Sequence, residues 1–228
     1  MNLKRLFSIV VRAIFLVAFM AGPTRSAPYR ISQFISPGIV SATDVQYPVN
    51  SMAAGAVSLL LSIDSNAKIQ SVQVLRDFPS LTSSVQNAVH NWKLTPATLN
   101  GHPVPSEISV TVIFNIFNPA GGAAYQSLVL SRPLSVPADE SHFTPPQISM
   151  ASFAKYPANS VSMGTVVLDV TVNRTGNPSN IRVIRGVPTL TEQAVLAVKS
   201  WGFNAATIQG QPTAAQMVIA FVFQRNVS

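Results

Sequence analysis

Cysteine is absent from the 228 residues, and charged residues are scarce, at 10%. The lack of cysteine excludes disulfides, thiolate metal sites, cysteine nucleophiles and lipid attachment to an N-terminal cysteine. Hydrophobic residues make up 47% of the chain, which allows a sizeable core and argues against extensive disorder. The folded part must therefore be stabilised by its core alone.

Clusters of basic residues are also lacking outside the N-terminus. The formal net charge is +7, but four of the 15 basic residues, Lys4, Arg5, Arg12 and Arg25, lie in the first 26 positions. The other basic residues are scattered singly along the chain. Because a surface that tracks phosphates needs clustered Lys and Arg, we expect no nucleic-acid partner.

Long hydrophobic runs are missing as well. Residues 1–26 have a basic start and an uninterrupted apolar run over 13–22, which suits a signal peptide and is shorter than the ~20 residues that span a bilayer. Thr24 and Ser26 are small residues placed for cleavage after Ser26. This predicts a periplasmic or secreted protein. The alternative is an uncleaved inner-membrane anchor over 6–22, with the rest facing the periplasm.

Catalytic and cofactor motifs are lacking too. The sequence has no Ser-centred elbow, phosphate loop or dinucleotide fingerprint, so we expect no enzyme and no cofactor. His90, His102 and His142 have no carboxylate cluster beside them, and the first two align with Lys199 and Gln211 in the repeat described next. We therefore expect surface histidines and no metal site.

The chain does contain an internal repeat. A shift of 109 residues aligns 47–114 with 156–223 without a gap, and roughly 20 of the 68 aligned positions are identical. Chance gives about one identity in fifteen, so the chain contains a duplication. The alignment extends weakly upstream, where Pro37 and Ile39 meet Pro146 and Ile148.

Each copy predicts the same elements. Alternating apolar residues predict strands at 56–63 and 71–76, and at 165–172 and 180–185, each pair joined by a polar turn. Apolar residues at helical spacing predict helices that end near Trp92 and Trp201, so both Trp side chains are expected in the core rather than on a ligand. Thr189 and Glu192 are spaced as a capping box. The last strands are 107–114 and 216–223.

The predicted fold class is α+β, with two tandem small domains. Each is a three-stranded antiparallel sheet with a helix packed on one face, in the order strand, strand, helix, strand. The domains are 36–118 and 145–225, joined by a linker over 119–144 in which "YQSLVL" is a candidate extra strand. The second face of each sheet must be solvated or covered by another element.

These residues resemble the C-terminal domain of TonB-family proteins, in which a Tyr-Pro pair, a Gly, a helix ending in Trp, a polar-Gly-x-Pro turn and a terminal Phe follow in order. The first copy has them as Tyr47-Pro48, Gly55, Trp92, Asn100-Gly101-His102-Pro103 and Phe114, and the second as Tyr156-Pro157, Gly164, Trp201, Gln209-Gly210-Gln211-Pro212 and Phe223. Each copy departs once from the Trp-x-Phe-x-Pro-Ala pattern, at Leu94 and at Ala205.

The resemblance implies a periplasmic module that pairs a partner peptide, such as one from an outer-membrane receptor, with the edge of its last strand. It thereby nominates ten residues as the binding edge: Glu107, Ile108, Ser109, Val110, Thr111, Gln216, Met217, Val218, Ile219 and Ala220. The Pro-rich spacer of an energy transducer is absent here. The alternative is therefore a scaffolding envelope protein whose domains pair with each other or with another protein. A further alternative is that the chain forms a homodimer.

The last strands are weakly protected as edges. The stretch 107–114 has one charge, at Glu107, 216–223 has none, and neither contains Pro. Because such edges are normally blunted or covered, we expect a strand to cover them. The covering strand is expected to come from a partner peptide, from the opposite domain or from the linker segment "YQSLVL". Arg76 and Arg185, at the ends of the second strands, are either solvated charges or contacts to a partner carboxylate.

Overall fold

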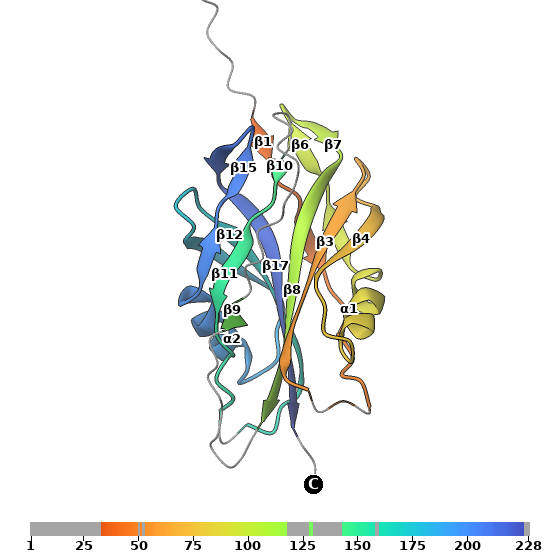
Figure 1. Ribbon diagram of the computed structural model, residues 1–228, viewed down its shortest axis with the longest axis vertical. Helices are drawn as coiled ribbons and strands as arrows, with labels where there is room; N and C mark the ends of the chain where they lie inside the picture. The colour runs from red at the N-terminus through yellow and green to blue at the C-terminus, as the bar shows by residue number, and fades with distance from the viewer. Residues whose placement is uncertain are drawn as a thin grey trace, which may run out of the picture. The chain divides into compact units, whose positions relative to one another are not determined.

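The computed structural model describes residues 33–49, 51, 53–117, 128–129, 143–157 and 160–225, all within one compact unit, Ser32–Ser228 (Figure 1). The predicted signal peptide and most of the predicted linker lie outside these residues. Within the described ranges, no helix has the length and apolar character needed to cross a membrane.

The two repeats have the same order of elements. The first contains β1 (Phe34–Ile35), β2 (Gly38–Ser41), β3 (Gly55–Ile63), β4 (Ile69–Arg76), α1 (Thr82–Val89), β5 (Lys93–Thr95), β6 (Ala97–Leu99), β7 (His102–Val104) and β8 (Ser106–Phe117). The second contains β10 (Phe143–Thr144), β11 (Gln147–Ala151), β12 (Gly164–Val172), β13 (Pro178–Arg185), α2 (Thr191–Lys199), β14 (Gly202–Asn204), β15 (Ala206–Ile208), β16 (Gln211–Thr213) and β17 (Ala215–Arg225). Between them, β9 (Leu128–Val129) confirms the extra strand and pairs with β11.

Each repeat forms the predicted three-stranded antiparallel sheet. In the first, β3 lies between β4 and β8, and in the second β12 lies between β13 and β17. The predicted Gly turn after each Trp is a hairpin whose two central residues have positive φ, at Asn100 and Gly101 (+53° and +84°) and at Gln209 and Gly210 (+51° and +72°). Positive φ at both positions suits a type I′ turn, which Asn-Gly favours.

The expected capping box is wrong. Leu190 occupies the cap of α2 without a side-chain hydrogen bond, and Thr189 has φ +65°. The hydroxyl of Thr191 instead accepts from the Val187 N–H and donates to the Val187 carbonyl. Thr82 makes the equivalent contacts to Phe78 in front of α1, so both helices begin with the same threonine-based turn.

The two sheets join through their last strands. β8 and β17 run parallel, paired from Val110 with Val218 to Phe117 with Arg225, and give one six-stranded sheet of order β13-β12-β17-β8-β3-β4. The prediction that these strands lie at sheet edges is therefore wrong. The alternative that the opposite domain covers them is confirmed.

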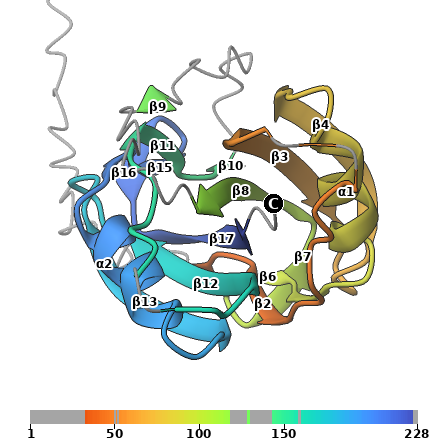
Figure 2. The same ribbon diagram turned by 90° about the horizontal axis from the view of Figure 1, so that it is seen from below.

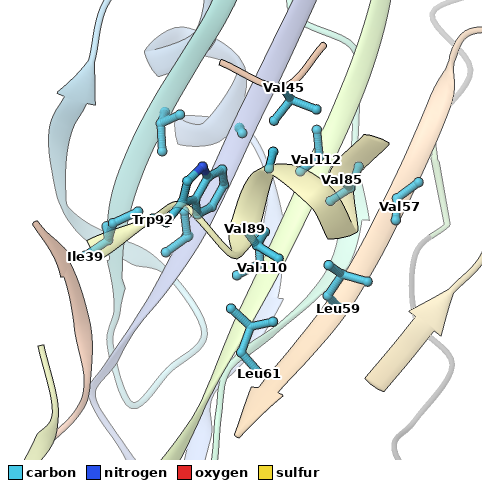
Figure 3. Close-up of a cluster of buried hydrophobic side chains, with 14 of the residues drawn as sticks. Ile39, Val45, Val57, Leu59, Leu61, Val85, Val89, Trp92, Val110 and Val112 are labelled. Atoms are coloured by element: carbon cyan, nitrogen blue, oxygen red, sulfur yellow. The ribbon is translucent and has the colours of Figure 1, made fainter. Parts of the chain in front are cut away.

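The helices lie on opposite faces of this sheet, as Figure 2 shows with α1 at the right and α2 at the left. Leu59, Val110 and Val112 face α1 on one side, where Val85 and Val89 lie over the strands (Figure 3). The other core packs alternate residues of β12 and β17, including Leu168 and Ile219, against Leu190, Ala194 and Val198 of the α2 segment. Trp92 and Trp201 are buried in the two cores, which confirms their predicted role.

The second face of each half-sheet is covered by the opposite repeat. Segment 36–45 of the first repeat lies on β12 and β17, where the Val45 N–H donates to Thr165 Oγ1 at 3.0 Å and the Gln216 N–H donates to Ser36 Oγ at 2.9 Å. Segment 146–154 of the second repeat lies on β8. There, Ser109 Oγ donates to the Pro146 carbonyl at 2.6 Å. The two repeats therefore share both of their cores.

Candidate protein-interaction surface

The ten residues predicted to form a binding edge lie on the two central strands of the sheet. Ile108–Thr111 of β8 and Met217–Ala220 of β17 are all buried, whereas Glu107 and Gln216 are half-buried. Val110 has Leu59 on one side and Val218 on the other, and Ile219 lies between Thr111 and Leu168. From Val110 and Val218 onward both neighbours are in place, so this part of the two strands has no open side for a partner strand.

The outer edges are instead β4 and β13, which the sequence reasoning did not nominate. Among the described residues, β4 pairs only with β3 and β13 pairs only with β12. The two strands occupy equivalent places in the repeats, but their side chains differ. This difference is the signal that the sequence contained, because Ile69 and Gln73 of β4 align with Pro178 and Arg182 of β13.

The β13 edge is protected against pairing with another strand. Pro178 begins the strand and supplies no backbone N–H, and Arg182 adds charge. Arg182 also donates to the Ile39 carbonyl at 2.9 Å, which fixes β2 of the first repeat beside β13. A partner strand would meet both charge and a missing donor here.

The β4 edge has no such protection. β4 contains no Pro, its one charged residue is Arg76 at the C-terminal end, and Gln70, Ser71 and Gln73 are exposed. Its register with β3 is regular from Ser71 to Val74. Such an edge is a template for an added strand.

Arg185 finds a carboxylate inside the chain. Its guanidinium forms a two-point ion pair with Asp44 of the first repeat, with Arg185 Nε at 3.1 Å from Asp44 Oδ1. Asp44 Oδ1 also accepts from the Thr165 N–H at 3.1 Å. Arg185 thus joins the two repeats. Arg76, its equivalent, lies half-buried at the end of β4, and its predicted contact to a partner remains a prediction.

Asp169 is a buried carboxylate in the centre of β12. Its Oδ2 accepts from Arg182 Nη2 at 2.6 Å, while Oδ1 has no hydrogen-bond partner within the described part of the chain. Burial raises the pKa of Asp169 above its ordinary value, although the hydrogen bond and charge of Arg182 partly oppose this. Loss of water around the carboxylate therefore outweighs the attraction of the arginine.

The Tyr-Pro motifs have a structural role. The hydroxyls of Tyr47 and Tyr156 donate to the carbonyls of Ala53 and Ser162, which closes the loop before β3 and before β12. Burial raises the pKa of both phenols. The Tyr47 ring also meets Phe114 edge to face, with centroids 5.4 Å apart, and Tyr156 meets Phe223 at 5.7 Å. The motif therefore fixes the loop against the last strand.

His90 and His102 are exposed, as predicted, and His142 lies outside the described residues. In the described part of the chain, no three His, Asp or Glu side chains are grouped so that they could hold a metal ion.

The comparisons with known proteins bear on this geometry. Residues 44–116 and 154–224 match the family model described as Gram-negative bacterial TonB protein C-terminal, which together is more than half of the chain. Comparisons with curated proteins and with solved structures gave no match. The two matched segments coincide with the two halves of the six-stranded sheet.

Proposed function

Because the chain belongs to the family of Gram-negative bacterial TonB protein C-terminal domains, we propose that it is a non-enzymatic scaffold that binds an extended segment of another protein along β4. The family gives the chain a TonB-like protein-interaction role in the cell envelope. The proposal adds the place of binding, the absence of energy transduction and a periplasmic location after removal of residues 1–26.

The pairing of β8 with β17 carries this proposal. A receptor peptide that bound at either last strand would first have to displace the other repeat from a ladder of eight paired residues. It would also disturb two cores, because Val218, Ala220 and Val222 of β17 pack in the core that α1 covers. Transport driven by such a peptide is therefore the less favoured role, and β4 is the edge best suited to a partner.

Site-specific photo-crosslinking in the cell tests the proposal. A photoreactive residue at Ser71 should give an adduct with a partner, whereas one at Asn180, the equivalent position of β13, should not. Adducts from Asn180 alone would contradict β4 as the binding edge. Adducts of twice the chain's own mass would show that a second copy occupies the edge.

Two proline variants sharpen the test. Successive N–H groups of a strand point in opposite directions within the sheet, so only one of Ser71→Pro and Val72→Pro removes an outward donor. That variant should keep its melting temperature and lose the partner adduct, because the lost donor belongs to the open edge. If Ser71→Pro and Val72→Pro both fold and both still give the adduct, the partner does not bind by strand pairing.

A further inference from the structure

A cleft opens at the end of the sheet where β3 ends and β8 begins. Its volume is about 770 Å³, within the range of ligand sites. In Figure 1 this is the end at which β1, β6, β7, β10 and β15 gather. Six large apolar side chains line it: Phe34, Ile63, Leu99, Val104, Phe143 and Ile208.

Both repeats build the apolar part of the cleft. Phe34 and Phe143 are equivalent residues, 109 apart, and their rings lie against each other with centroids separated by 4.8 Å. Leu99 and Ile208 are equivalent in the same way, and Leu99 is 39% exposed. The cleft therefore exists only because the two repeats fold together.

The charge of the cleft has one sign. Asp64 and Glu107 line it, and none of its lining residues in the described chain is basic, although the whole sequence has 15 basic and 8 acidic residues. An apolar floor beside two carboxylates is complementary to a bulky apolar group that carries a positive charge.

The turn that contains Asp64 does not require a carboxylate. Asn173 replaces Asp64 in the second repeat and closes the same turn, since each side-chain oxygen accepts backbone N–H groups two and four residues later at 2.8–3.0 Å. Because an amide closes the same turn in the second repeat, the negative charge of Asp64 is not needed for this turn. Glu107, which aligns with Gln216, accepts a hydrogen bond from Ser62 Oγ at 3.5 Å at the mouth of the cleft.

The cleft also adjoins the proposed binding edge. Gln70, in the exposed part of β4, is one of its lining residues. A peptide that pairs along β4 would therefore bring one of its ends to the cleft. We propose that the cleft binds the end of the partner segment through an aromatic or large aliphatic residue next to Lys or Arg. The identification of the occupant as a peptide rests on the proposed function, whereas the preference for an apolar and cationic group does not.

Two sets of synthetic probes test this inference on the purified full chain. Acetylated dipeptide amides, Phe-Lys, Phe-Glu and Ala-Lys, are too short to pair with β4 and report on the cleft alone by NMR titration. Octapeptides of alternating Thr and Val that end in the same pairs report on edge and cleft together by calorimetry. In both sets Phe-Lys should bind about tenfold more tightly than either of the others.

Conservative variants identify the cleft residues. Asp64→Asn with Glu107→Gln should weaken Phe-Lys binding about three- to tenfold and abolish its advantage over Phe-Glu, because two charges at a partly exposed site are lost. Leu99→Ser should weaken both Phe probes. Glu192→Gln, which removes an exposed negative charge from α2, is the matched control and should change nothing.

The outcomes separate the two proposals. Octapeptides that bind at β4 with equal affinity for Lys and Glu ends, unaffected by the cleft variants, would overturn this inference and leave the proposed function standing. If the dipeptides bind the cleft as described but the octapeptides bind the β4 proline variants as tightly as the parent, the cleft proposal is supported and strand pairing is overturned. Dipeptides that bind irrespective of charge would also overturn the inference.

Discussion

Asp169 occupies a position that is apolar in the first repeat, where Leu60 stands. Its partner Arg182 likewise replaces Gln73. The pair belongs to the second repeat only, and Arg182 extends it to the Ile39 carbonyl of the first repeat. At the level of single residues, the two copies therefore differ at their outer strands. The β13 edge is fixed by the Asp169–Arg182 pair, and the β4 edge is open.

Asp169→Asn should make stability less dependent on pH. Because the folded-state pKa of Asp169 is raised, its contribution to stability is fully present below the unfolded pKa of about 3.9 and is lost as pH rises through the folded value. Asn does not titrate. Arg182, whose side chain is 54% exposed, stays solvated without its partner. The variant should thus gain stability relative to the parent as pH rises from 4 to 7.

Urea unfolding at several pH values measures this difference. Asp64→Asn, which removes a carboxylate from a surface turn, controls for the change in net charge. A variant that lost stability relative to the parent with rising pH would mean that the attraction of Arg182 outweighs burial.

At the scale of elements, periodicity and turn chemistry predicted the six strands of the central sheet, both helices and their order, because local spacing decides these features. The short strands that flank the helices and the Gly turns were not predicted, since two or three residues are too few to show a period. Which strands pair with each other was harder to predict, since pairing depends on surfaces far apart in the sequence. One signal was present. The run from Met217 to Phe223 is apolar at every position, which is typical of a strand buried on both faces, as in parallel pairs.

The binding site was hard to predict for the same reason, because its position depends on which strands pair in space. The resemblance nominated the last strand of a single domain, and only the spatial pairing of the two copies moves the open edges to β4 and β13. The carboxylate that Arg185 binds could not be assigned either, because Asp44 lies 141 residues away in sequence.

Val110→Pro should unfold or severely destabilise the protein. At a sheet edge the loss would be modest, but Val110 lies between β3 and β17, so proline removes a ladder hydrogen bond whichever way its N–H points. We expect a loss of about 3 kcal/mol or more in urea unfolding, against little change for one of the two β4 proline variants. A fully stable Val110→Pro protein would contradict the central position of β8.

At the scale of the whole molecule, the repeats should unfold together. Val167, Val218, Ala220 and Val222 of the second repeat lie in the core that α1 covers, and Ala56 and Ile113 of the first lie in the other core. Trp92→Ala and Trp201→Ala should therefore each lower one common transition, by about 3–5 kcal/mol in unfolding free energy. Calorimetry would show two transitions, one of them unchanged, if the repeats were instead independent.

The unequal edges also fix a stoichiometry. Two separate copies of one repeat, paired through their last strands, would present two identical outer strands and bind two partner segments. In this single chain, Pro178 and Arg182 stand on one outer strand, while Ile69 and Gln73 occupy the equivalent positions on the other. We therefore expect this molecule to saturate with one partner segment per chain, so that it ends an assembly at that partner rather than bridging two of them.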